Sequence, residues 1–207
     1  RILEADYALL AIGVTGNIED SGIEDVGIIT ENGSIKVNKY NQTNIPNIYA
    51  IGDVSGPPWL AHVASVQGAL SVEHAFEGSA QTIDYNNIPG CTYTQPQVGS
   101  IGLTEKAALN EGFNIKVGKY SFKSNGKAMA VGHNDGFVKL IFDEQYGELI
   151  GAHIIGSEAT ELIGQLSVAK ALESTWEDLA FGVFAHPTLS EAIMEAALDA
   201  YGIGIHQ

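Results

Sequence analysis

Two strand-length apolar runs separated by a short polar loop constrain the fold of this chain more than any other feature. The runs cover 137–142 and 149–155, and Asp143–Gly147 between them has the length and composition of a hairpin loop. The same patterns predict further strands at 98–103 and 115–122, and helices from Thr104 to Gly112, from Ser157 to about Glu173, after Thr175 and after Thr188. The second half is therefore predicted to be an α+β domain, an antiparallel sheet flanked by helices.

The longest of these predicted helices has one clear apolar face. The side chains that fall at helical spacing on it are Ala159, Leu162, Ile163, Leu166, Ala169 and Leu172. We expect this face to pack on the sheet. The domain that contains it should fold by itself.

The first half follows a different pattern, and composition changes at 86–90, which we take as the boundary between domains 1–88 and 89–207. Buried strands are predicted at 7–12 and 48–51, a short alternating strand at 34–37, and a helix from about Trp59 to Phe76 that stops at Gly78. These elements make an incomplete α/β portion with uncovered sheet edges. The abrupt start without an initiator methionine also suggests a fragment.

Charge and cysteine content exclude several classes of function. The formal net charge is −15, with 10 Lys and Arg against 25 Asp and Glu, so we expect neither nucleic acid nor anionic lipid as a partner. No apolar run reaches the roughly 18 residues of a membrane span. Cys91 is the only cysteine, which excludes an internal disulfide and a cysteine zinc site. The six histidines lack metal-ligand spacing, and we expect no metal.

One candidate ligand site lies at 52–62, where a predicted strand passes through a Gly/Pro loop into a helix. Gly52 permits close backbone approach, and the Asp53 carboxylate can accept hydrogen bonds from hydroxyl groups. The helix start, Trp59, Leu60, Ala61 and His62, offers N–H groups to an anion or an electron-rich ring. From the residues alone, Asp53 could equally shape a turn.

The segment His186–Glu191, sequence HPTLSE, supports two interpretations. Thr188 and Glu191 have the spacing of a capping box at a helix start. Alternatively, His186 is an acid/base whose imidazole is oriented by the Glu191 carboxylate. Capping boxes are far commoner than such pairs, so spacing alone favours the structural interpretation.

The motifs at 43–62 and 186–191 together resemble segments of the FAD-dependent disulfide reductases. ADYALLAIG (5–13), GSIKVN (33–38) and STWEDLAFGVFAHPTLSE (174–191) extend the similarity over essentially the whole chain. GPPWLAH (56–62) and TLSE (188–191) are most similar to the dihydrolipoamide dehydrogenase branch of this family. A glutathione reductase-like member is the alternative within the family.

The resemblance implies specific roles. His186 would deprotonate a dihydrolipoyl thiol with Glu191 as its orienting partner, and residues 89–207 would be the dimerisation domain. Asp53 would bond the FAD ribitol, Gly52 would let the backbone come close to the cofactor, residues 59–62 would border the flavin, and Gly13 would lie on the NAD side. The implied partners are a second copy of the chain and the lipoyl domain of a 2-oxoacid dehydrogenase or glycine cleavage complex. The implied compartment is the bacterial cytoplasm or the mitochondrial matrix.

Departures from the family pattern limit what this chain could do alone. It contains neither the redox cysteine pair nor a G-x-G-x-x-G loop for a diphosphate. The family's Arg pair and Pro after the glycine at position 13 are replaced by 14–17, VTGN, and Phe184 stands where many relatives have a second histidine. We therefore expect an inactive chain whose full-length parent is the oxidoreductase. A dimerisation module with dormant chemistry is the other possibility.

Overall fold

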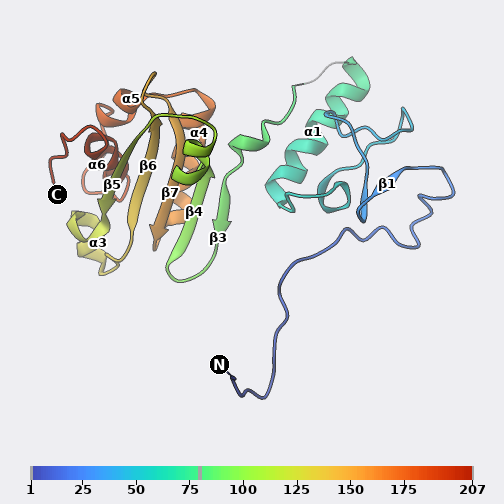
Figure 1. The fold of residues 1–207 in the computed structure, drawn as a ribbon, viewed down its shortest axis with the longest axis horizontal. Coiled ribbons are helices and arrows are strands. Elements are labelled where there is room, and N and C mark those ends of the chain that lie inside the picture. Colours follow the sequence, from blue (N-terminus) through green and yellow to red (C-terminus); the bar gives the residue numbers. More distant parts are fainter. Residues whose placement is uncertain (1, 79–80, 207) are drawn as a thin grey trace. The chain divides into compact units, whose positions relative to one another are not determined.

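The computed structural model describes residues 2–78 and 81–206, which form two compact units, Arg1–Ile83 and Asp84–Gln207 (Figure 1). The units divide at 83/84, five residues before the domain boundary expected from the sequence.

A five-stranded antiparallel sheet forms the centre of the second unit. Its spatial order is β3-β4-β7-β6-β5, and the strands are β3 (Gly90–Thr92), β4 (Gln97–Gly102), β5 (Ile115–Ser121), β6 (Phe137–Asp143) and β7 (Leu149–Gly156). The predicted hairpin is β6–β7, and its register shifts at Ile141/Phe142. Each strand predicted in this half lies within one or two residues of an observed strand.

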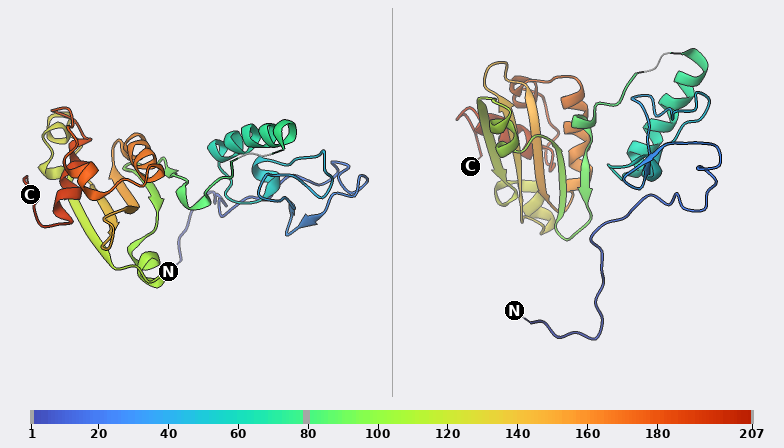
Figure 2. Two further views of the ribbon diagram at one scale, coloured as in Figure 1. Left: turned by 90° about the horizontal axis from the view of Figure 1, so that it is seen from above. Right: turned by 45° about the vertical axis from the view of Figure 1, so that its right-hand side comes forward.

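Alternation along β6 gives the sheet two apolar faces. Val138, Leu140 and Phe142 face the main core, whereas Ile141 joins a smaller cluster on the other face. The main core is covered by α4 (Ala159–Ala171), α5 (Trp176–Ala180) and α6 (Glu191–Asp199), and the smaller cluster by α2 (Glu105–Asn110). Figure 2 shows α4 and α6 on the same side of the sheet. The predicted α+β architecture is confirmed.

The ends of α4 correct two predictions. The helix starts at Ala159 after Glu158, which makes no side-chain cap, so Ser157 does not cap it. The predicted apolar face is buried from Ala159 to Ala169, but Leu172 is 72% exposed. Leu172 lies one residue past the last residue of the helix.

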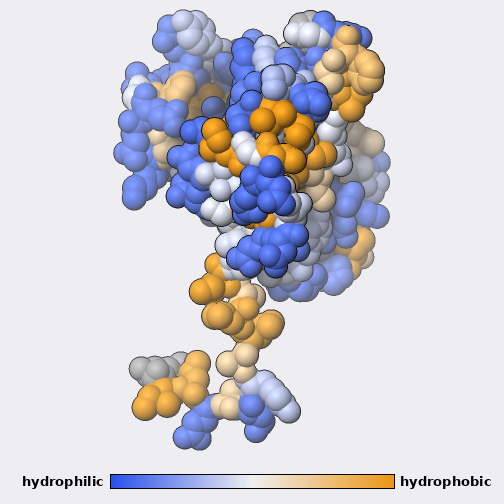
Figure 3. All heavy atoms as spheres, turned by 90° about the vertical axis from the view of Figure 1, so that its right-hand side faces the viewer, coloured by the Kyte–Doolittle hydropathy of each residue, from blue (hydrophilic) through white to orange (hydrophobic). Residues whose placement is uncertain are grey.

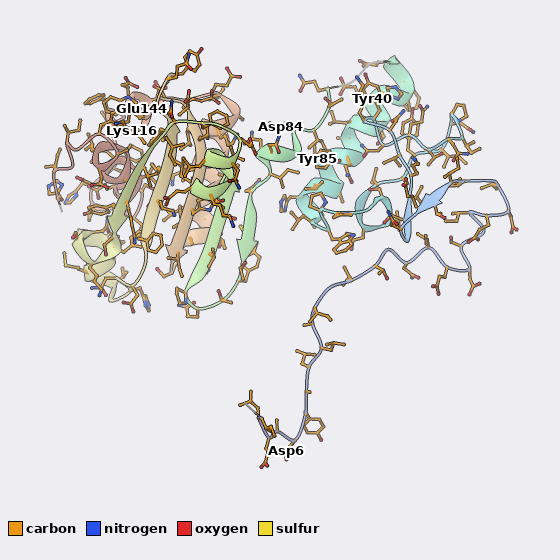
Figure 4. The ribbon with its side chains drawn as sticks, in the orientation of Figure 1. Asp6, Tyr40, Asp84, Tyr85, Lys116 and Glu144 are labelled. Carbon is orange, nitrogen blue, oxygen red and sulfur yellow. The ribbon has the colours of Figure 1, made fainter. Side chains whose placement is uncertain are left out.

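Three short elements flank the strands: one precedes β3, and the other two lie between β5 and β6. They are η2 (Tyr85–Asn87), η3 (Phe122–Ser124) and α3 (Gly126–Val131). Near the start of β5, Lys116 forms an ion pair of 3.0 Å with Glu144 of the hairpin loop, and Figure 4 shows the two side chains together. This exposed pair links β5 to the start of the hairpin loop.

The first unit is built around one helix and short strands. It contains β1 (Thr30–Glu31), β2 (Ser34–Ile35), η1 (Gly52–Ser55) and α1 (Ala61–Glu77). The helix stop predicted at Gly78 is confirmed, because this residue has φ 73° and donates its N–H to the His74 carbonyl. The start predicted near Trp59 lies two residues too early.

Two strands predicted in this unit are absent from the described residues. The 7–12 segment is extended and exposed, and Figure 3 shows its hydrophobic side chains in solvent. The 48–51 segment forms only one isolated bridge, between Tyr49 and Gln42. A strand needs neighbouring strands to satisfy its N–H and C=O groups, and the described part of this unit supplies none for either run.

No helix in 2–78 or 81–206 is long and apolar enough to cross a membrane. In the same ranges, no three His, Cys, Asp or Glu side chains are grouped so as to hold a metal ion.

Candidate functional site

His186 and Glu191 are in direct contact. Nδ1 of His186 lies 2.8 Å from Oε1 of Glu191, and the imidazole side chain is 78% exposed whereas the carboxylate is 21% exposed. An ionised carboxylate only accepts hydrogen bonds, so Nδ1 carries the proton in this pair. In the neutral ring, Nε2 is then the basic nitrogen. The exposed ring can accept a proton there from a group of another molecule.

The second oxygen of Glu191 fixes the carboxylate to the backbone. Oε2 accepts the N–H of Thr188 at 2.8 Å, which is half of the predicted capping box. The other half is wrong, because the Thr188 hydroxyl donates to the Ala185 carbonyl at 2.7 Å instead. The helix begins only at Glu191, after a turn at 189–190, and Ser190 is its N-cap. The helix ends at Asp199.

Two residues that the sequence did not single out hold this segment from neighbouring elements. Buried Asn125, the N-cap of α3, donates from Nδ2 to the Thr188 carbonyl at 3.1 Å. Gln165 of α4 donates to the Ser190 hydroxyl at 2.8 Å. Asn followed by Gly-Lys-Ala could have signalled a helix cap, but nothing local signals a contact 63 residues away.

A surface hollow surrounds the pair. Its lining residues are Tyr120, Ser124, Asn125, Gly126, Met129, His186, Glu191, Met194, Glu195 and His206. Burial opposes ionisation of Glu191, but the hydrogen bonds from Thr188 and His186, with the charges of His186 and His206, outweigh it and lower the pKa of Glu191 below 4.5. Burial, followed by the charges of Glu195 and Glu191, raises the pKa of Tyr120. Glu191 is therefore held ionised at neutral pH.

The candidate ligand residues of the first unit lie on one turn and the helix start that follows it. Gly52 has φ 69°, which favours glycine, and its N–H donates to the buried Gln67 at 2.7 Å. Asp53 is exposed on η1. Leu60 precedes α1 and makes no side-chain cap, and exposed Ala61 and His62 form the first turn. Trp59 is also exposed.

Two glycines at the start of this unit behave differently. A Cβ at Gly16 would lie 3.1 Å from the Asp53 carbonyl oxygen, so the backbones meet there, a contact that the sequence did not indicate. A Cβ at Gly13 would meet nothing within 4 Å. Gly13 is exposed, and no such close approach joins it to the 52–62 segment.

The donor set at 52–62 fits the flavin cofactor that the resemblance implies. An exposed carboxylate can accept hydrogen bonds from polyol hydroxyls, and the start of α1 carries the positive end of the helix dipole without a side-chain cap. Exposed Trp59 and partly buried Leu60 beside them offer apolar surface to a ring.

Comparison with known proteins extends these observations. The family model described as "Pyridine nucleotide-disulphide oxidoreductase, dimerisation domain" matches residues 88–197, and the one described as "Pyridine nucleotide-disulphide oxidoreductase" matches 1–68. The dihydrolipoyl dehydrogenase of Rhizobium etli is 50% identical over 201 residues, 97% of this chain and 42% of that protein. The dihydrolipoyl dehydrogenase of Zymomonas mobilis is 47% identical, over 97% of this chain and 43% of its own length.

The fold is shared with a solved structure as well. LpdA from Mycobacterium tuberculosis superposes with a TM-score of 0.88 at 29% identity, covering 95% of this chain and 43% of that one. The chain thus spans less than half the length of these relatives. The dimerisation-domain model matches more than half of the chain, and the similarity to the relatives runs along nearly all of it. The chain therefore belongs to the pyridine nucleotide-disulphide oxidoreductase family.

Proposed function

We propose that the protein containing this chain is a dihydrolipoyl dehydrogenase, which oxidises dihydrolipoyl groups and passes the electrons through FAD to NAD. The observation that carries the proposal is the 2.8 Å contact between the exposed His186 imidazole and the anchored Glu191 carboxylate. The dihydrolipoyl dehydrogenases at 47–50% identity support the choice of substrate.

In this proposal His186 is the acid/base and Glu191 its positioning residue. Nε2 of His186 takes the proton of a dihydrolipoyl thiol, because the thiolate rather than the thiol attacks a disulfide. The resulting imidazolium is stabilised by the Glu191 carboxylate, which already accepts the Nδ1 proton. The imidazolium then releases its proton to solvent, to which the side chain is open.

The electrons need groups that this chain does not contain. Oxidation of a dithiol to a disulfide releases two protons and two electrons, and a disulfide acceptor requires two cysteines, whereas the chain has only Cys91. We propose that another segment of the full-length protein supplies the pair, and that the 207-residue chain alone is inactive.

We assign the flavin-facing role to the 52–62 segment. Asp53 would accept hydrogen bonds from the ribitol, Gly52 would let the backbone approach, and Trp59, Leu60, Ala61 and His62 would border the ring. Gly13 would lie on the NAD side. The chemistry that bound FAD would supply is transfer of an electron pair from the enzyme dithiol to NAD.

The proposed assembly is a homodimer through residues 89–207, with the boundary to the cofactor-binding portion at 88/89. The match to a dimerisation-domain model supports this. So do the exposed apolar side chains of Phe181 and Val183, just before His186, which would be covered in a dimer. The lipoyl domain of a 2-oxoacid dehydrogenase or glycine cleavage complex is the proposed protein substrate.

Steady-state turnover of the full-length protein tests the proposal. We expect NAD-dependent oxidation of dihydrolipoamide and no comparable reduction of glutathione disulfide. The reverse preference would instead support a glutathione reductase-like enzyme.

A dormant dimerisation module remains the second candidate for the 207-residue chain itself, because Cys91 is alone. An absorption spectrum of the purified chain separates the two. A flavin band would contradict the dormant module, and a spectrum without one, together with a dimer in sedimentation, would support it.

A further inference from the structure

Glu195 is a buried carboxylate that the proposed chemistry does not use. Its side chain is 3% exposed, and it forms three hydrogen bonds with residues 205–206 of the C-terminal segment. Oε2 accepts the N–H groups of Ile205 at 3.0 Å and His206 at 3.2 Å, while Oε1 lies 2.6 Å from Nδ1 of His206. A buried charge is costly unless it is paired and hydrogen-bonded, so these contacts account for the position of Glu195.

The contacts bring the end of the chain back to α6, as Figure 1 shows. Glu191 and Glu195 are four residues apart on this helix and therefore lie on one face, one turn apart. Both carboxylates line the same hollow, and so do their imidazole partners His186 and His206. Two carboxylate–imidazole pairs thus stand side by side in one site.

We propose that Glu195 and His206 are positioning residues for the His186–Glu191 pair: Glu195 fixes the C-terminal segment, and this places the His206 imidazole at the hollow that Glu191 lines. The proposal rests on the proposed function for its kinetic consequence. The arrangement itself is independent of it.

The charges around the hollow are the physical basis for an effect of His206 on Glu191. Its titratable groups are Tyr120 of β5, His186, Glu191 and Glu195 of α6, and His206, whereas η3 and α3 contribute Ser124, Gly126 and Met129, which do not titrate. The charge of His206 lowers the pKa of Glu191 and so adds to the effect of His186 and Thr188. His206 thereby helps to keep the orienting carboxylate ionised.

Titration of Glu191 tests the part played by His206. The 207-residue chain, labelled with ¹³C at the glutamate carboxyl carbons, is titrated by NMR, with the Glu191 resonance assigned from Glu191→Gln. His206→Ala keeps both backbone N–H bonds to Glu195 and removes only the imidazole. His206→Asn keeps a side-chain donor without the charge. His133→Ala, at an exposed histidine of the same unit that lines a different hollow, is the control.

We expect the Glu191 midpoint to move upward in His206→Ala and His206→Asn and to stay in place in His133→Ala. An unchanged midpoint in His206→Ala would overturn the inference. Recovery of the wild-type midpoint in His206→Asn would also overturn it, since the charge would then be irrelevant.

A second readout uses the full-length protein in the reverse direction, lipoamide reduction by NADH. His186 must then donate a proton, so activity persists at acid pH until Glu191 is protonated. His206→Ala should move the acidic side of the pH–rate profile to higher pH. The rate there should fall by roughly two- to fivefold, with little change near neutrality. A pH–rate profile that coincides with that of the wild type at acid pH would contradict the kinetic role of His206.

The attachment of the C-terminal segment has its own test. Glu195→Leu replaces the buried charge by an apolar side chain of similar size and removes all three acceptor contacts. Hydrogen exchange at the Ile205 and His206 amides should become faster than in the wild-type chain, and unchanged exchange would overturn the role of Glu195. Absence of any dihydrolipoamide activity in the full-length protein would refute the proposed function alone, because the NMR and exchange results do not depend on it.

Discussion

The carboxylate of Glu191 joins the His186 imidazole to the backbone: Oε1 lies 2.8 Å from Nδ1 of His186, and Oε2 accepts the Thr188 N–H at the same distance. The imidazole therefore has a fixed partner although most of its surface is exposed. This arrangement suits an acid/base that must meet a thiol from another molecule while keeping its tautomer.

Glu191→Gln should separate the charge of this residue from its shape. The amide can still accept one hydrogen bond but cannot stabilise an imidazolium, so we expect dihydrolipoamide oxidation by the full-length protein to slow on the order of 10²-fold. Loss of the charged acceptor for the Thr188 N–H should also lower the free energy of unfolding by about 1 kcal/mol. Steady-state rates and urea unfolding measure the two effects. Equal rates in the variant and the wild type would exclude an orienting role.

The stability that Glu191 contributes should depend on pH in a defined direction. Because its pKa in the folded chain is lowered below 4.5, the ionised form is favoured by folding. The contribution is fully present above that ordinary value and is lost as pH falls through the folded-state pKa. Urea unfolding of the wild type and Glu191→Gln across acid pH should therefore converge as pH falls. A difference that grows on acidification would contradict the lowered pKa.

Asn125→Ala should loosen the segment that carries His186. It removes the cap of α3 and the donor to the Thr188 carbonyl, so we expect a loss of about 1–3 kcal/mol in unfolding free energy and a roughly tenfold lower rate. Ser121→Ala is the matched control, since Ser121 caps η3 through the Lys123 N–H. If the control loses as much activity as Asn125→Ala, the contact with Thr188 has no special role.

Gly118→Ala should disrupt the packing that places α6. A Cβ at Gly118 would overlap the Ala196 carbonyl oxygen of α6, so α6 would have to move away from β5, at a cost of roughly 3 kcal/mol. Gly126→Ala is the control, because its Cβ would meet nothing within 4 Å at the start of α3. Thermal unfolding compares the two. A wild-type melting temperature in Gly118→Ala would show that the close contact is not required.

Local signals in the sequence predicted most of the second unit. The β6–β7 hairpin, the face of α4 from Ala159 to Ala169 and the short helix after Thr175 each depend on a local sequence pattern. The sequence predicts two alternatives for Glu191, a helix cap or a partner of His186. In the structure it has both roles: Oε1 contacts His186, and Oε2 accepts the Thr188 N–H.

Features that depend on distant partners could not be predicted in this way. Runs such as 7–12 and 48–51 are apolar enough for buried strands, but no neighbouring strand pairs with them in the described residues. The Thr188 hydroxyl bonds backward to Ala185 because the chain turns once more before α6 starts. Asn125 and Glu195 act through residues brought near only by the fold.

The most direct test of the central claim is the rate at which dihydrolipoamide reduces the full-length protein carrying His186→Gln. We expect this half-reaction to slow by roughly 10²–10⁴-fold relative to the wild type, the usual contribution of a general base. His133→Gln, at an exposed histidine outside the hollow, should leave it unchanged. A His186→Gln protein that is reduced as fast as the wild type would contradict the assignment of His186 as the acid/base.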